Sequence, residues 1–353
     1  MGTAKGKAAR AAATVGVVSL TLVMLVAVGG PLGAQDAEVT YLEGFPELKS
    51  GGGSRYELDF GDLVKPGDSV ITGKRDYAEL EQGSGNSIRV NESTVFTLKQ
   101  VEREGRTRTV LSNAVGSVSY RFRRATGREP GVETAGVAAG VRGTELTVYA
   151  ADDGSSLFAV QSGLVDVESA GETVSLSENE AVEIAPGEPP GETFEWLGRE
   201  LDFSSWNEER LDAFLDDPVE GLRRIRRRMD YFADRLEETY AAYREARAEL
   251  DAAREEADRL REDGDSVAEE ELRQERIAPA MQQASTLVLN YRYYALSALS
   301  LRRFVLGKMY MQVKTRYILE ADSSALQAFA DQHAEIVEDF EERVVPRLVE
   351  ADI

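Results

Sequence analysis

Cysteine is absent from the 353 residues of this chain, and histidine occurs once, at His333. Without cysteine the chain has no disulfides, no thiolate metal ligands and no acylated lipoprotein cysteine. A single histidine gives little basis for a zinc site, and on a helical stretch it is more simply a surface or partly buried structural residue. The sequence therefore predicts neither a metal nor another cofactor.

Positive charge is also scarce. Lys and Arg number 41 against 63 Asp and Glu, so the formal net charge is −22, and both halves of the chain are acidic. Nucleic acid is excluded as a partner because its phosphates require a cationic surface. The strongest basic cluster, Arg223–Arg228, is expected to pair with acidic residues across a helix bundle rather than with nucleic acid.

Residues arranged for catalysis are not evident either. There is no Gly-x-Ser-x-Gly elbow, and carboxylate pairs carry no information without geometry in so acidic a chain. Gly83-Ser84-Gly85-Asn86 lacks the Lys and helix of a phosphate loop, and Asp152-Asp153-Gly154 lacks the ligand series of a calcium loop. Both are predicted to be turns, and the protein is expected not to be an enzyme.

An apolar run near the N-terminus indicates export. Lys5, Lys7 and Arg10 precede the run Ala11–Val28, which ends at Gly29-Gly30-Pro31. This pattern predicts a signal peptide over residues 1–34, cleaved after Ala34. An uncleaved membrane anchor is the competing interpretation, because about 18 residues are just enough to cross a bilayer. Either interpretation places the rest of the chain in the periplasm or cell envelope, with membrane contact only through this segment.

Residues 38–185 are typical of an all-β domain. Short runs rich in Val, Thr, Tyr, Phe and Leu alternate with Gly, Asp and Asn turns, and many runs alternate polar and apolar residues. We expect a sandwich, roll or short solenoid of many short strands, with no helix between Val39 and Ile184. The Pro- and Gly-rich stretch Ala185–Glu192 then opens a linker and junction over residues 186–203.

Residues 204–353 predict a separate all-α domain, so the fold class is α+β as two domains. From Pro218 to about Glu262 the apolar positions recur at spacings of three and four, as in a long coiled-coil-like helix. A second run reaches Glu320, with a bend or fresh start near Pro279, and a third begins at Ser324. The matched lengths of the first two predict an antiparallel hairpin, with the third helix packed along part of it as a bundle.

Helix starts and aromatic residues add detail. Ser205 with Glu208 reads as a capping box, and Asp217 followed by Pro218 marks a second helix start. Trp196 and Trp206 lie at the domain junction and are interpreted as packing residues, with sugar stacking as the alternative. Five tyrosines of the second helical run form either core or a partner surface: Tyr291, Tyr293, Tyr294, Tyr310 and Tyr317.

An ordered series of glycine-containing elements is the most specific pattern in the chain. Pro66-Gly67-Asp68 opens a Val-x-Thr strand, Val141-Arg142-Gly143-Thr144 occupies the middle, and Gly163 begins a Gly-x-Val-x-Val element. Over about residues 41–184 this series resembles the FecR-like domain, named for envelope regulators of ferric-citrate uptake. The resemblance implies an extracytoplasmic β-module whose family motif falls on Gly67, Asp68, Val141, Arg142, Gly143, Thr144 and Gly163. The helical region resembles no family in this way.

The resemblance implies no reaction. Regulators of this family carry a sigma-factor-binding segment before their membrane helix, whereas about ten residues precede the apolar run here, so an anti-sigma role is not expected. Arg142 is the one candidate ligand-binding residue, because a guanidinium suits a carboxylate or phosphate. The alternative is that Arg142 pairs with a nearby acid or with backbone carbonyls beside Gly143, which is itself expected at a turn or bulge.

The predicted function is that of an exported, non-enzymatic interaction or scaffold module. The β-domain would hold an envelope protein or cell-wall polymer, and the helices would give reach or self-association. One alternative is a membrane-anchored sensory component related to FecR-type regulators. Another is a module that binds cell-wall glycan.

Overall fold

The computed structural model describes residues 36–350, apart from residue 84 and residues 104–105, 124–129, 197–200 and 321–322. The predicted signal segment, residues 1–34, lies outside the described residues. Among the helices of the described part, none combines the length and apolar character needed to cross a bilayer.

The N-terminal half is built from β-strands joined by short turns. In chain order they are β1 (Ala37–Glu43), β2 (Glu47–Lys49), β3 (Arg55–Glu57), β4 (Leu63–Val64), β5 (Ser69–Ile71), β6 (Tyr77–Gln82), β7 (Asn86–Val90), β8 (Val95–Arg103), β9 (Arg106–Arg121), β10 (Gly131–Thr134), β11 (Ala138–Ala150), β12 (Ser156–Ser169), β13 (Glu172–Leu176), β14 (Glu180–Ile184) and β15 (Thr193–Glu195). This confirms the prediction of an N-terminal region made of many short strands.

The strands form one sheet that wraps around a single apolar core. Strand β9 is long enough to change neighbours along its length, since its first part pairs with β8 and β10 and its last part pairs with β7 and β11. The β9–β10 pair is parallel, and the other pairings are antiparallel. Alternate residues from both sides of the wrap meet in the core, among them Val39, Leu80, Leu98, Val148 and Val182. The arrangement is therefore a rolled sheet.

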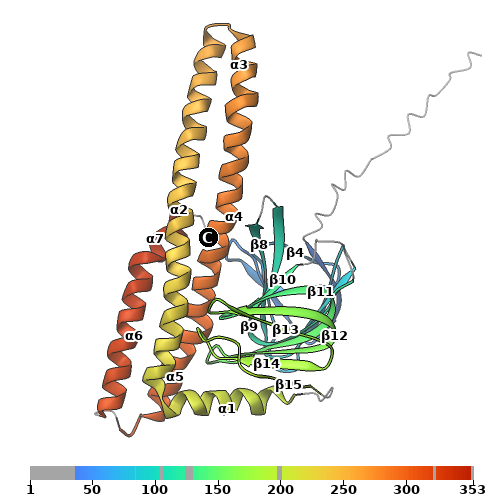
Figure 1. Cartoon of the computed structure of the whole chain (residues 1–353), viewed down its shortest axis with the longest axis vertical. Helices are drawn as coiled ribbons and strands as arrows, with labels where there is room; N and C mark the ends of the chain where they lie inside the picture. Colours follow the sequence, from blue (N-terminus) through green and yellow to red (C-terminus); the bar gives the residue numbers. More distant parts are fainter. Residues whose placement is uncertain are drawn as a thin grey trace, which may run out of the picture.

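The C-terminal half is helical. Its elements are α1 (Phe203–Asp216), α2 (Pro218–Glu262), α3 (Ser266–Leu272), the π-helical turn η1 (Arg273–Ile277), α4 (Ala278–Ser300), the π-helical turn η2 (Leu301–Leu306), α5 (Gly307–Arg316), α6 (Ser324–Arg343) and α7 (Val345–Glu350). Helix α2 runs antiparallel to the continuous stretch from α3 to α5, and α6 packs along the lower part of α2 (Figure 1). The predicted hairpin with a third helix is confirmed.

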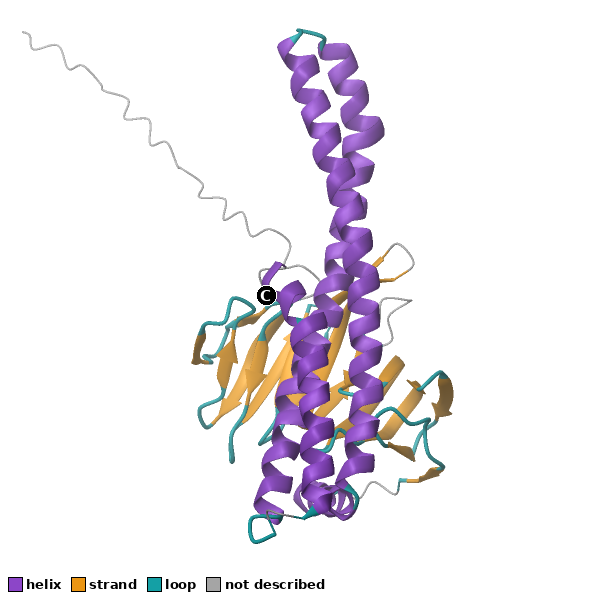
Figure 2. Cartoon of the chain, turned by 90° about the vertical axis from the view of Figure 1, so that its left-hand side faces the viewer, coloured by secondary structure: helices purple, strands orange, loops and turns teal. Residues whose placement is uncertain are grey.

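The hairpin is much longer than the sheet it packs on. With 45 residues, α2 extends for about 67 Å. The lower half of the hairpin lies against the rolled sheet through α4 and η2, and its upper half, made of the end of α2, α3 and the start of α4, projects clear of the sheet (Figure 2). The projecting part has a narrow seam that is mostly alanine, formed by Ala246, Leu250, Ala280 and Ala284.

Two helix starts test the predicted caps. Helix α1 begins at Phe203 and is capped by Asp202, whose carboxylate accepts hydrogen bonds from the Ser204 N–H (3.1 Å) and the Ser205 hydroxyl (2.8 Å). The predicted capping box at Ser205 is therefore wrong, because Asp202 captures the free donors one turn earlier. The start at Asp217 and Pro218 is confirmed, since Asp217 accepts from the Glu220 N–H at 3.1 Å.

The predicted linker also contains regular structure. Residues 193–195 form β15, which pairs with β14. The strand becomes available because the prolines end at Pro190, so Thr193, Phe194 and Glu195 all keep their backbone donors.

The predicted irregularity near Pro279 is a π-helical turn. Proline has no N–H to donate within the helix, and the preceding η1 turn places the Ala278 N–H on the Arg273 carbonyl, five residues back. The helix thus passes Pro279 without ending. The second π-helical turn, η2, has no proline near it and was not expected.

Candidate functional site

The residues of the FecR-like motif shape a bulged strand pair. Gly143 in β11 has a φ of +56° and Gly163 in β12 has a φ of +91°, both in the left-handed region that favours glycine. The β11–β12 register shifts between Arg142 and Glu145. A Cβ on Gly163 would lie 2.6 Å from the Gly143 carbonyl oxygen, so the two strands approach too closely for a side chain there.

The remaining motif residues hold this geometry in place. The buried Thr144 hydroxyl accepts from the Arg142 N–H (3.2 Å) and donates to the Leu164 carbonyl (2.9 Å), which stitches the bulge to β12. Val141 is buried in the sheet core. Gly67 has a φ of +99°, and the Asp68 carboxylate beside it accepts from the Gly51 and Lys65 N–H groups. In this structure the motif residues set backbone geometry.

Arg142, the candidate ligand residue, has an exposed side chain on β11 opposite the exposed Leu164. Within the described residues, no carboxylate lies within ion-pair distance of its guanidinium. The predicted acidic partner is therefore not found there, and a ligand-binding role for Arg142 stays a prediction.

The segments Asp152–Gly154 and Gly83–Asn86 were both predicted to be turns rather than ligand-binding loops. Asp152 and Asp153 belong to the β11–β12 turn, where Asp153 accepts from the Ser155 N–H and hydroxyl at 2.8 Å and Asp152 pairs with Lys308 at 2.6 Å. Gly83 and Gly85 lie in the β6–β7 turn. Across the described part of the chain, no group of three or more His, Asp and Glu side chains is placed to hold a metal ion.

His333 is a packing residue on α6. Its ring stacks on Tyr310 with centroids 4.3 Å apart, next to Phe329. Burial, together with the nearby charge of Arg302, lowers the pKa of His333 to about 4, so the ring is neutral at pH 7.

A polar cleft of about 930 Å³ opens on the outer face of the rolled sheet, between β6, β7, β9, β11 and β12 on one side and the start of α1 on the other. Cross-strand neighbours form its floor, because Arg89 lies opposite Ser119 and Ser119 lies opposite Thr147. The Ser119 and Thr147 hydroxyls are 3.0 Å apart, and the Gln161 amide donates to Thr147 at 3.1 Å. The floor is thus a connected row of hydroxyl and amide groups.

Aromatic residues close one end of this cleft. Tyr149, Trp196 and Phe203 line it and pack together with Trp206, with ring centroids 6.2–6.4 Å apart. Trp196 and Trp206 are only 9% and 6% exposed. Their predicted packing role at the junction is confirmed, and little of either ring is open to stack on a sugar.

A buried ion pair joins the sheet to the hairpin. The Lys99 ammonium on β8 contacts the Glu133 carboxylate on β10 at 2.6 Å and the Ser297 hydroxyl on α4 at 3.0 Å. The Tyr293 hydroxyl, also on α4, donates to the other Glu133 oxygen at 2.5 Å. Burial alone would raise the pKa of Glu133, but the Lys99 charge and the hydrogen bonds it accepts outweigh burial and lower this pKa.

The five tyrosines of the second helical run, three on α4, one on α5 and one just after it, divide between two surfaces. Tyr291 is 1% exposed and lies in the helical core against Tyr240 and Tyr243, whereas Tyr293 faces the sheet and is 6% exposed. Tyr294, Tyr310 and Tyr317 are partly buried against the helical core. The core interpretation is confirmed, with Tyr293 at the interface between the two halves.

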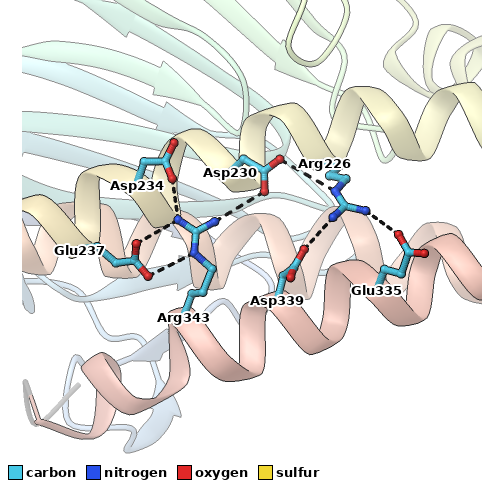
Figure 3. Close-up of polar contacts among 7 residues, drawn as sticks. All are labelled: Arg226, Asp230, Asp234, Glu237, Glu335, Asp339 and Arg343. Carbon is cyan, nitrogen blue, oxygen red and sulfur yellow. Dashed lines mark hydrogen bonds and ion pairs between the residues drawn. The ribbon is translucent and has the colours of Figure 1, made fainter.

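The basic cluster on α2 pairs with acidic residues as predicted. Arg226 contacts Glu335 (2.7 Å) and Asp339 (2.9 Å) on α6 (Figure 3). From the other side Arg343 of α6 reaches back to Asp234 and Glu237 on α2 (Figure 3). Two further arginines, Arg224 and Arg227, pair with Glu188 of the Pro- and Gly-rich segment. The cluster therefore holds α2 against its neighbours.

Together these features define a rolled β-domain whose one face is covered by a long helical hairpin. The FecR protein family model matches residues 68–166, so the chain contains a FecR domain, as the motif resemblance predicts. The match includes Asp68, the Val141–Thr144 motif and Gly163.

Comparison with solved structures finds two of a protein from Parabacteroides distasonis that is proposed to be an anti-sigma factor. Each is 17% identical to this chain, with TM-scores of 0.30 and 0.31. The alignments cover 36% of this chain and 59% of that protein, so the chain spans less than two thirds of its length. Among curated proteins no match is found.

Sequence reasoning missed the buried ion pair and the polar cleft. Lys99 and Glu133 lie in runs that otherwise read as ordinary strands, and Ser297 is 198 residues from Lys99. A weak signal was present, since Lys99 follows the core residues Phe96 and Leu98 on a strand most of whose described residues are buried. The cleft floor is assembled from five strands, and none of them carries a distinctive motif.

Proposed function

We propose that this chain is an exported, non-enzymatic interaction module of the cell envelope. Its FecR domain anchors a helical hairpin that reaches out to an envelope protein or cell-wall polymer. The observation that carries the proposal is the projecting half of the hairpin, which extends beyond the sheet while its lower half is fixed to the FecR domain (Figures 1 and 2). The FecR domain and the N-terminal apolar run support an envelope location.

The projecting half is built as a solvated stalk. Its outer faces carry ion pairs such as Arg247–Asp251, Arg276–Glu256 and Arg261–Glu269. Such pairs favour solubility and contribute little stability individually. Near the end of the stalk Val267 is 69% exposed, and an apolar side chain of this kind is where a partner gains most from contact.

A shortened hairpin tests this role in the full chain. Leu250 and Ala280 meet in the same apolar cluster, so residues 251–279 can be replaced by a short glycine-containing turn that joins them. We expect this variant to fold and to lose the partners that the intact protein captures from native envelopes. A matched variant, Arg247→Gln, keeps the hairpin length and should keep those partners. Capture of the same partners by the shortened chain would contradict the proposal, as would a hydrolase activity abolished by one carboxylate substitution.

Glycan binding is a second candidate, favoured by the floor of the polar cleft. Its row of hydroxyl and amide groups from Ser119, Thr147 and Gln161 offers donors and acceptors of the kind that sugar hydroxyls use. Retention of the protein on cell-wall polysaccharide should then be lost in Thr147→Arg, which fills the cleft. Retention that survives this change would reject the cleft as a glycan site.

A further inference from the structure

A second hollow lies on the opposite side of α4 from the hairpin core. Two adjoining hollows of about 520 and 220 Å³ follow α4 and η2 beneath the glycine-rich loop that joins β2 to β3. They share Gly51, Gly52, Gly67 and Leu296, so they form one continuous groove, here named the α4 groove. Its size suits a single small molecule.

The wall of the α4 groove on the helix side is apolar. Leu289, Leu296 and Phe304 are half-buried there, and they take part in none of the apolar clusters that the described residues form. Ile71 and Val349 face the groove from the sheet and from α7. The groove therefore holds apolar surface that neither core of the protein uses.

The charge of the α4 groove is opposite to that of the whole protein. The chain has 63 acidic and 41 basic residues, yet no Asp or Glu is among the residues that line the groove. Its lining includes Lys49, Arg292 and Arg303, and within the described part of the chain none of the three has a carboxylate within ion-pair distance. The fourth cation, Lys99, is already paired with Glu133.

Two of these cations lie close enough to affect one another. Burial, and then the positive charges of Arg303 and Arg55, lower the pKa of Lys49. An anion placed between Lys49 and Arg303 would remove this repulsion. The π-helical turn η2 carries both Arg303 and Phe304, and π-helical turns are frequent at functional sites.

We propose that the α4 groove binds an anionic amphiphile, with its aliphatic chain along Leu289, Leu296 and Phe304 and its carboxylate between Lys49 and Arg303. Charge complementarity selects the anion, because the groove gathers three cations without a carboxylate partner among the described residues of this acidic protein. One of the three, Arg303, lies over the Phe304 ring. The exposed apolar wall selects an aliphatic body. The bound molecule is a free acyl carboxylate, since the groove is a bounded hollow of small-molecule size.

Calorimetric titration of the full chain with dodecanoate tests the site. We expect saturable binding of one molecule per chain, at least tenfold weaker in the Lys49→Gln/Arg303→Gln double variant. Leu296→Asn should also weaken binding, because it places an amide on the apolar wall. Lys74→Gln removes an exposed cation outside the groove and should leave the affinity unchanged.

Matched probes separate the two halves of the proposal. Dodecanol shares the chain and lacks the charge, and dodecyltrimethylammonium reverses the charge, so both should bind at least tenfold more weakly than dodecanoate. Equal affinity for dodecanol, or no saturable binding of dodecanoate, overturns the proposal. Binding only to vesicles of anionic phospholipid also overturns it, in favour of a membrane surface. The α4 groove shares no residue with the projecting half of the hairpin. If dodecanoate does not bind, the proposed envelope role of the hairpin is therefore unaffected.

Discussion

At the scale of single residues, the Lys99–Glu133 pair decides how firmly the two halves of the chain are joined. Both side chains are almost fully buried, since Lys99 is 2% exposed and Glu133 is 4% exposed. Taking two charges out of water is costly, and their mutual attraction offsets the cost only with good geometry and further hydrogen bonds. Here Tyr293 and Ser297 supply those hydrogen bonds from α4, so the pair is best satisfied when the hairpin is in place.

Removing one partner of this pair is expected to be more harmful than removing both. Glu133→Gln leaves the Lys99 ammonium buried without its counter-charge and should lower the free energy of unfolding by about 3–5 kcal/mol. Lys99→Met/Glu133→Leu removes both charges and should recover most of that loss. Urea denaturation of the three proteins measures the difference. A double variant as unstable as Glu133→Gln would show that the charges themselves are not the cause.

The effect of a glycine-to-alanine substitution on stability should depend strongly on its position in the β11–β12 pair. Gly163→Ala introduces a Cβ at a positive φ and only 2.6 Å from the Gly143 oxygen, so it should destabilise the protein by about 2–3 kcal/mol. Gly140→Ala, three residues before Gly143 in the same strand, meets no atom within 4 Å and should change stability by less than about 0.5 kcal/mol. Thermal unfolding of both variants provides the comparison, and equal effects would argue against the bulge as the constraint.

His333 predicts a contribution to pH dependence. Its pKa is about 4 in the folded protein and 6.5 ordinarily, so the unfolded chain takes up a proton at a higher pH. Its contribution to stability is therefore present above about pH 6.5 and is lost as the pH falls towards 4. Because the residue is only partly buried, we expect about 1 kcal/mol. His333→Phe keeps the stacking without titration, so it should lose less stability than the wild type between pH 7 and pH 4.5 in urea denaturation.

At the scale of elements, the ion-pair network between α2 and α6 holds the third helix. Arg343 contacts Asp230, Asp234 and Glu237, and its own side chain is about a quarter exposed. Such partly exposed networks are screened by salt, unlike the apolar contacts beneath them.

Arg343→Met should therefore weaken the packing of α6 by about 1 kcal/mol at low salt and by less at 1 M NaCl. Hydrogen exchange of the α6 amides reports this local stability. Arg235→Met is the matched control, because among the described residues the ion pair of Arg235 lies within α2, with Glu238 three residues on. Equal protection loss at both salt concentrations would assign the effect to lost packing instead.

The helices also show what periodicity can and cannot predict. The stripe of Leu222, Ile225, Met229, Phe232 and Leu236 predicted α2, and all five residues are buried. The capping residue of α1 and the η2 turn were not predicted. Both depend on which of several nearby acceptors binds a given backbone N–H group, and periodicity carries no information about that choice. Strand β15 was not predicted because the prolines before it indicated a linker. Its three residues nevertheless keep backbone N–H groups that can pair in a sheet.

At the scale of the whole molecule, the sequence predicted two halves correctly but not the contacts between them. The Val-Arg-Gly-Thr motif predicted the FecR domain because its glycines are needed locally, within one strand pair. The buried ion pair, the polar cleft and the α4 groove are each assembled from residues far apart in the chain, such as Lys49 and Arg303. Only the folded topology brings these residues together.

The buried junction predicts that the two halves unfold together. Trp196 and Trp206 pack at the junction, so their fluorescence reports on it, while circular dichroism at 222 nm reports mainly the helices. In the wild type both signals should change at one denaturant concentration, as expected for a single cooperative unit. In Glu133→Gln the fluorescence change should come first. Separate transitions in the wild type would contradict the coupling.

During synthesis, the sheet side of this junction is made before the helix that covers it. The last strand ends at Glu195, whereas Ser297 follows about a hundred residues later. At a synthesis rate of about 5–20 residues per second, the sheet can form roughly 5–20 seconds before its covering helix emerges. During that interval Lys99 and Glu133 face water, and the sheet surface that α4 later covers is bare. A newly made chain whose sheet forms in this interval therefore exposes a surface that other chains can contact.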